Sequence, residues 1–360
     1  MGLKLISRKP SSAEFDLAAF MSFVEDTPKI RRRLERVAGP EAIEFMLGVL
    51  NSFIQAVGPG PIGPMVALTH QYVTARGSRA REEAWLRFEP YLGPGHSRFH
   101  TEPPRVGQRP RPIDDGVIER YADEAWYASL GGFIVALADT HKLEPATAPL
   151  FGGLPKAARY GRDGFCSELV RVLSEAEMIV LDTAALELLD RIDTLLIDGE
   201  LLEDAEPVVE LLVRSGRRAG LAVVISETEP EAAKRVGGRA LPVGAGPLRD
   251  EIRDMQRSGD CVAVVGRFSH DIFATADFGV GIPTVGEPVP WAADVVTTPS
   301  VEDAILLVEA IERAGRVAEH SVLLSGIGAT LGMFLSLQGL QKTNPESIKL
   351  AVNAVSMVSL

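Results

Sequence analysis

Polar residues whose side chains could take part in a reaction lie directly after short apolar runs in this sequence. Asp198, Ser226 and the segment 266–271, which ends on Asp271, each follow such a run. Short apolar runs that alternate with helical patterns indicate strands of a parallel sheet, and ligands of such sheets bind beyond the carboxyl ends of the strands. We therefore expect a site at this edge, with Asp198 where a phosphotransferase places its nucleophile.

The elements that position these residues follow from the pattern between residues 178 and 318. Helices are predicted between the strands from amphipathic stretches, with glycine after their last turn or a capping residue before their first. The predicted fold class is α/β, a Rossmannoid parallel sheet with flanking helices. The predicted strands are 178–182, 193–198, 221–226, 261–266, 277–282 and 293–296, and the predicted helices are 204–220, 230–238, 247–259 and 301–319.

Three charge-poor regions add apolar helices to this fold. The region 45–75 predicts a hairpin of two helices, and 126–138 predicts one short helix. The region 321–341 has the length of a bilayer span, and an apolar piece follows it to the end of the chain. Buried core helices are the alternative for each region. Between 76 and 123 the sequence is charged and rich in Gly and Pro, which predicts an irregular segment.

The predicted division of the chain therefore has six parts. They are a helical extension (1–40), an apolar hairpin (41–76), a short charged segment (77–123), an apolar helix with a stalk (124–177), the α/β domain (178–318) and C-terminal apolar helices (319–360).

Composition excludes several classes of function. The formal charge of −12 argues against nucleic-acid binding, which requires a basic surface. Cys166 and Cys261 stand far apart and outside any metal-binding spacing, so neither a disulfide framework nor a zinc site is expected. His96 and His100 are four residues apart, but in a Gly/Pro-rich stretch, and we expect no bound metal. The mean hydropathy of +0.10 is high for a soluble protein.

The order of these segments resembles that of the cation-transporting P-type ATPases, members of the haloacid dehalogenase (HAD) superfamily, and most closely their degenerate actinobacterial forms. The similarity extends over residues 40–360. Segment 150–198 is similar to a membrane helix with a central proline, here Pro155, and the stalk that enters the phosphorylation strand. Segment 208–237 resembles the helix and strand that hold the TGD motif, and 252–282 resembles the stretch that holds GDGxND.

Most residues of the family's catalytic motifs are replaced in this sequence. Asp198 matches the phosphorylated aspartate of DKTGT, but the next four residues read GELL, and Glu200 adds a carboxylate suited to acid/base chemistry. Ser226 keeps a phosphate-binding hydroxyl where TGD begins. Arg249 is a poor substitute for the family's lysine. The GDGxND motif reads GRFSHD, which puts Arg267 where an aspartate should hold Mg²⁺.

The absence of two family domains and the replaced motif residues lead to several functional hypotheses. The span 201–220 leaves room for one helix where the family inserts a nucleotide-binding domain, and 76–123 is too short for an actuator domain. Our first hypothesis is a catalytically inactive relative with a scaffold or regulatory role and no cofactor. A residual Mg²⁺-dependent phosphohydrolase or phosphotransferase, a component of a cation transporter, and a soluble protein with an apolar partner surface are the alternatives.

Further expectations concern ligands, partners and location. Arg267 and His270 could form an anion site with Ser226, whereas Asp271 could simply cap a helix or turn. The apolar regions 45–75 and 321–360 would contact a membrane or an apolar protein partner, and a homo-oligomer is possible. The expected location is a membrane-associated chain with a cytoplasmic α/β domain, with a cytoplasmic protein as the alternative.

Overall fold

The computed structural model describes residues 62–88, 109–141, 156–241, 248–284 and 289–338, together with residue 358. They fall into two compact units, which we describe separately. The helical unit holds the described residues up to 73, those between 115 and 164, and those from 317 onward. The α/β unit holds the described residues of 74–114 and 165–316. The six-part division of the chain stays a prediction.

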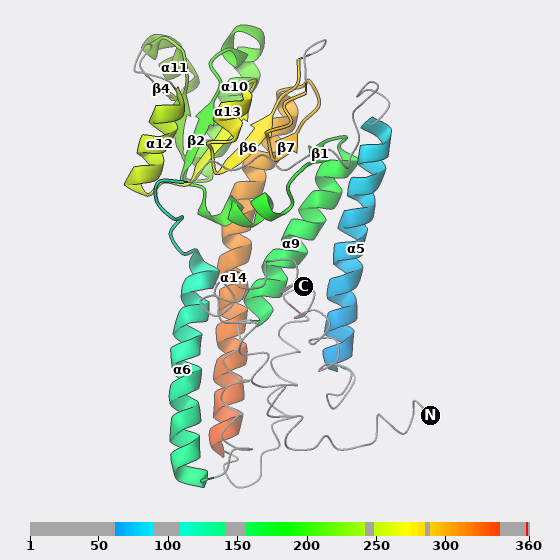
Figure 1. Ribbon diagram of the computed structural model, residues 1–360, viewed down its shortest axis with the longest axis vertical. Coiled ribbons are helices and arrows are strands. Elements are labelled where there is room, and N and C mark those ends of the chain that lie inside the picture. The colour runs from blue at the N-terminus through cyan, green and yellow to red at the C-terminus, as the bar shows by residue number, and fades with distance from the viewer. Residues whose placement is uncertain are drawn as a thin grey trace. The chain divides into compact units, whose positions relative to one another are not determined.

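A seven-stranded sheet forms the centre of the α/β unit (Figure 1). Its order is β1-β7-β6-β5-β2-β3-β4, and every neighbouring pair is parallel except β1 and β7. The predicted α/β class and all six predicted strands are confirmed, and β4 is the strand that the sequence did not reveal. The strands are β1 (Ile179–Val180), β2 (Thr194–Ile197), β3 (Ala222–Ile225), β4 (Arg239–Ala240), β5 (Val262–Gly266), β6 (Phe278–Gly281) and β7 (Val295–Val296).

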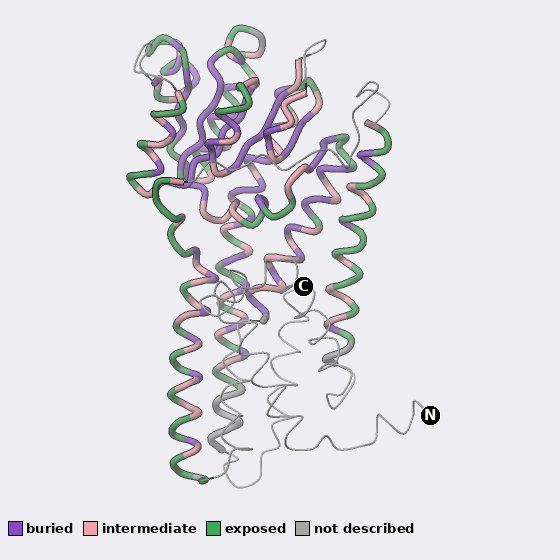
Figure 2. Tube along the Cα trace, viewed as in Figure 1, coloured by how far each residue is buried: buried purple, intermediate pink, exposed green. Residues whose placement is uncertain are grey.

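Packed side chains cover both faces of this sheet. Leu195 and Ile197 belong to one buried cluster, while Leu196 between them belongs to the other. Alternate residues of a strand point to opposite faces, so continuously apolar strands need helices on both sides. Figure 2 shows the strands as the most continuously buried part of the trace. The surrounding elements are the 3-10 helix η2 (Ala184–Arg191) and the helices α10 (Leu201–Arg218), α11 (Pro230–Val236), α12 (Leu248–Ser258) and α13 (His270–Phe273).

Helix α5 (Ile62–Phe88) corrects the predicted irregular segment that begins at residue 76. The helix continues because its second half is rich in Ala, Arg, Glu and Leu, which favour helix, and because it has partners. The Arg81 guanidinium donates two hydrogen bonds of 2.6 Å, to the carbonyl oxygens of Val180 and Leu181. Trp85 is 8% exposed and packs in the second buried cluster.

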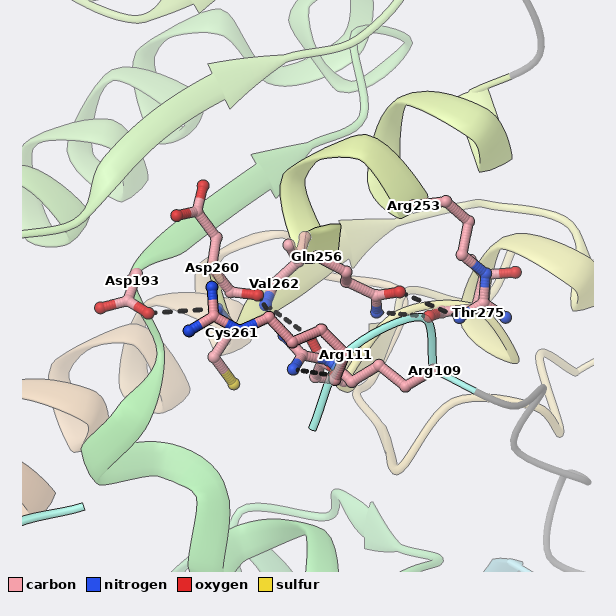
Figure 3. A network of polar contacts seen from close by, with 10 residues as sticks. Arg109, Arg111, Asp193, Arg253, Gln256, Asp260, Cys261, Val262 and Thr275 are labelled. Carbon is pink, nitrogen blue, oxygen red and sulfur yellow. Dashed lines mark hydrogen bonds and ion pairs between the residues drawn. The ribbon is translucent and has the colours of Figure 1, made fainter. Parts of the chain in front are cut away.

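An extended strap, residues 109–114, packs on the α/β unit near the amino ends of β5 and β6 (Figure 3). Arg109 Nε lies 2.7 Å from Asp277 Oδ1, and these side chains are 12% and 5% exposed. Arg109 also donates to the Asp260 carbonyl oxygen. The sequence contains no signal for this ion pair, because its partners lie 168 positions apart on the chain (277 − 109).

Long helices make up the described part of the helical unit. α6 (Val117–Thr140) contains the predicted helix 126–138, and α9 (Lys156–Glu175) and α14 (Glu302–Gln338) both extend from one unit into the other. Ile118, Ala158 and Ala318 form a small buried cluster. The Ala158 N–H donates to Ser325 Oγ at 2.7 Å.

The predicted separate helix 321–341 is wrong, because its described residues continue α14 without a break. No breaking residue or cap separates them from the preceding amphipathic turns. Within the described ranges, no helix combines the length and hydropathy needed to cross a bilayer. The predicted first helix of the hairpin, Pro155, His96 and His100, and the C-terminal piece after 338, apart from residue 358, lie outside the described residues.

Candidate functional site

The register of the sheet places the predicted site residues side by side. Ile197 pairs with Ile225 of β3 and with Val265 of β5. The residues that follow these three, Asp198, Ser226 and Gly266, therefore leave the sheet at the same level. Parallel strands in register make this juxtaposition unavoidable once the strands are assigned.

Asp198 is held tightly at this edge. It is 4% exposed. Its Oδ2 accepts a hydrogen bond of 2.8 Å from the Arg267 N–H, and its Oδ1 accepts one of 3.1 Å from the Glu200 N–H. Burial is the largest influence on this carboxyl and raises its pKa, the two N–H groups lower the pKa, and the negative charge of Glu227 raises it again. The net effect of the surroundings is to favour the neutral acid.

Two glycines let the backbone close around Asp198. A Cβ at Gly199 would lie 2.1 Å from the Ser226 carbonyl oxygen, and one at Gly266 would lie 2.1 Å from the Asp198 Cβ. Neither position has room for any other residue without movement of the main chain. Glycine at position 199 is therefore required for packing of this loop. It is also one of the residues that differ from the DKTGT motif.

The Ser226 hydroxyl points into the protein. Ser226 is 1% exposed, and its Oγ lies 3.4 Å from both the Gly199 N–H and the Ile197 carbonyl oxygen. It does not line the neighbouring cavity. The expectation that Ser226 joins Arg267 and His270 in one anion site is therefore not met by this arrangement.

A cavity of about 420 Å³ opens beside Asp198. Four carboxylate residues and two arginines contribute to its wall, so acidic side chains outnumber basic ones there. The described residues that line it are Asp198, Glu200, Glu227, Leu248, Arg249, Arg267, Phe268, Ser269, Asp271 and Ile272. The structure thus brings Asp198, Glu200, Arg249, Arg267 and Asp271 together, as the strand ends predicted.

Glu227 is the lining residue that sequence reasoning missed. Its φ of +48° is left-handed, an uncommon conformation for a residue with a side chain. Its charge acts on Asp198. The available signal was its position, directly after Ser226 at a strand end, where any polar side chain is placed near the others.

Asp271 differs from Asp198 in its surroundings. It is exposed, and its Oδ1 accepts a hydrogen bond of 2.5 Å from Ser269 Oγ. This bond is the main reason why its pKa is lowered, with a smaller contribution from the charge of Arg249. Asp271 lies in the first turn of α13, where a negative charge is favourable. The prediction of a role in capping this turn agrees with its position.

His270 lines a second, smaller cavity of about 260 Å³ next to the first. Arg267 and Phe268 line both cavities. His270 is therefore separated from Arg249 and Asp271 and grouped with aromatic residues and prolines.

The four carboxylate residues that line the first cavity raise the question of a bound cation. Among the described residues, no three His, Cys, Asp or Glu side chains are grouped so that they could hold a metal. Arg267 contributes a fixed positive charge to the same wall, which opposes a divalent cation. No chemistry that depends on a metal is assigned to this site.

Comparison with known proteins gives distant relatives. No family model matches the chain. It is 24% identical to the "Probable cation-transporting ATPase I" of Mycobacterium tuberculosis over 336 aligned residues, which cover 67% of this chain and 21% of that protein. The protein of the same name from Mycobacterium leprae is 24% identical over 312 residues, which cover 61% of this chain and 19% of that protein. The chain therefore spans about a fifth of the length of these relatives.

A solved structure of a zinc-transporting PIB-type ATPase in its E2.Pi state matches with 12% identity and a TM-score of 0.41, over 79% of this chain and 65% of that one. A TM-score below 0.5 does not by itself establish a shared fold. The similarity therefore rests on the sequence matches: this chain is distantly similar to the probable cation-transporting ATPases of these two mycobacteria.

Proposed function

We propose that this chain is a catalytically inactive relative of the P-type ATPases and acts as a scaffold or regulatory binding component. The observation that carries the proposal is the setting of Asp198, which is 4% exposed at the wall of a cavity lined by more acidic than basic side chains. Attack on a phosphate requires a carboxylate oxygen that the incoming group can reach.

The electrostatics of the cavity support the same proposal. Phosphoryl transfer depends on positive charge that neutralises the transferred group. Here Glu200, Glu227 and Asp271 accompany Asp198, and two arginines oppose them. A phosphate in this cavity would meet more negative than positive side chains, and the Ser226 hydroxyl is turned away from it.

A phosphatase assay tests this proposal. We expect the purified chain with Mg²⁺ and either ATP or p-nitrophenyl phosphate to release phosphate no faster than Asp198→Asn. That substitution keeps the size of the side chain and one hydrogen-bond acceptor. Turnover that disappears in Asp198→Asn would show that the residual-hydrolase alternative is right, as would Mg²⁺-dependent binding of fluoroberyllate.

We further propose that the helical unit contacts a membrane or an apolar protein partner, while the α/β unit stays in the cytoplasm. Large apolar side chains are exposed on its helices: Tyr127, Ile134 and Val135 on α6 are 62%, 58% and 66% exposed, and Leu323, Ile327 and Leu331 on α14 are 62%, 52% and 45% exposed. Exposed apolar groups at helical spacing favour an apolar contact surface. A second copy of this chain is the alternative partner. A role as a component of a cation transporter is the alternative function, and it is based on the names of the longer relatives.

A further inference from the structure

The smaller cavity, lined by Arg267, His270 and aromatic residues, has a chemistry of its own. Phe268, Phe273 and Trp291 contribute aromatic rings to its wall. Phe268 and Phe273 stand edge to face, with ring centroids 6.0 Å apart. Trp291 is braced by Trp85 and Phe88 of α5, at 6.0 Å and 6.5 Å. A preformed wall of rings favours a flat apolar ligand.

The charge of this cavity is of one sign. Arg267 and His270 are the described lining residues that carry or can carry a charge, and no carboxylate is among the lining residues. Arg267 also lines the neighbouring cavity with its four carboxylate residues, so its positive charge faces both cavities. Aromatic walls alone would attract cations. The guanidinium of Arg267 reverses that preference, because a like charge at the same site is repelled.

The size of the cavity limits the ligand further. Its volume of about 260 Å³ is smaller than the usual range for sites that take drug-sized molecules. One or two fused rings with a short anionic group fit these limits.

We propose that this cavity binds a small aromatic carboxylate, with the ring between Phe268, Phe273 and Trp291 and the carboxylate paired with Arg267. A guanidinium can pair with a carboxylate through two parallel hydrogen bonds, which gives both orientation and selectivity. Asp198 does not line this cavity, although Arg267 lines both cavities, and the proposal does not depend on the loss of phosphoryl transfer proposed above.

Calorimetric titration of the full chain with three matched probes tests this proposal. Indole-3-carboxylate should bind more tightly than indole, and the cation 3-(aminomethyl)indole should bind more weakly than indole. Arg267→Met should weaken binding of indole-3-carboxylate by about 10-fold and leave indole nearly unaffected. Arg249→Met is the matched control, since Arg249 lines the first cavity but not this one, and it should leave all three probes unchanged.

A second variant protects the test against a change in folding. Thr284→Trp should fill the cavity from its partly exposed rim and abolish binding of both indole and indole-3-carboxylate, with thermal unfolding used to confirm the fold. Equal affinity of the wild-type chain for the three probes would overturn the proposal, as would undiminished binding in Arg267→Met. Phosphatase activity sensitive to Asp198→Asn would instead overturn the proposed function and leave this inference standing.

Discussion

Single residues around Asp198 serve packing as much as chemistry. Gly199 and Gly266 allow contacts that no side chain would permit, and Ser226 uses its hydroxyl on the main chain. In the sequence, Gly199 is a departure from a phosphorylation motif. In the structure, Gly199 lets the loops after β2 and β3 come into contact, because a side chain at this position would collide with the Ser226 carbonyl oxygen.

The glycine contact gives a stability prediction. Gly199→Ala should lower the free energy of unfolding by about 1–3 kcal/mol, because the new methyl group would lie 2.1 Å from the Ser226 carbonyl oxygen. Urea denaturation of the full chain measures the change. Gly315→Ala is the control: it lies inside α14 with nothing within 4 Å of the added Cβ, and should raise stability by up to about 1 kcal/mol. Equal effects of the two substitutions would contradict this account.

At the scale of elements, the register of three parallel strands, β2, β3 and β5, brings the site together. The strap fixes the opposite end of β5 and of its neighbour β6. The Arg109–Asp277 ion pair crosses from the strap to the residue that precedes β6. Asp277 Oδ2 also accepts a 2.8 Å hydrogen bond from the Val262 N–H of β5. One carboxylate therefore links the strap with both strands.

Removal of the Arg109 side chain should be costly and pH-dependent. Burial raises the pKa of Asp277, and the Val262 N–H and Arg109 lower it. In Arg109→Met the pKa should rise further, so the folded variant holds a proton that the unfolded chain releases. Stability of the variant then falls as pH rises, so the loss should be smaller near pH 5 than near pH 8, where it should reach about 3–5 kcal/mol.

Urea denaturation at both pH values measures this loss. Arg111→Met is the matched control, since its ion pair with Asp114 has 46% and 72% exposed side chains and should contribute less than about 1 kcal/mol. A loss in Arg109→Met that is the same at both pH values, or no larger than that in Arg111→Met, would show that Asp277 is not held by this pair.

At the scale of the whole molecule, the chain combines an α/β unit with a helical unit and spans a fifth of its relatives. The proposed apolar contact of the helical unit predicts fractionation. The full chain should stay with the membrane fraction in alkaline carbonate and be released by detergent, because carbonate removes proteins held by charge but not by apolar contact.

Substitutions sharpen this fractionation test. Ile134→Glu with Val135→Glu should move the chain into the soluble fraction, since both side chains are more than half exposed on α6. Leu211→Glu, at a 47% exposed position on α10 of the α/β unit, is the control and should leave the distribution unchanged. Release of the wild-type chain by carbonate alone would contradict contact with the membrane and favour an apolar protein partner.

Sequence by itself determined the α/β class, six of the seven strands and the edge at which the site lies. It could do so because continuously apolar runs and helix ends are local signals, and because parallel strands bring their carboxyl ends together. The short strand β4 escaped detection, since a two-residue strand leaves no periodic pattern. Likewise, the length of α5 was missed because Arg- and Glu-rich helices and charged loops share a composition.

Only the tertiary structure decided which polar groups face each other. The direction of the Ser226 hydroxyl, the presence of Glu227 in the cavity wall and the separation of His270 from Asp271 depend on main-chain geometry at strand ends. The Arg109–Asp277 pair joins residues that no local pattern connects. These are contacts between distant segments, and their energies arise from burial and charge that the folded chain alone creates.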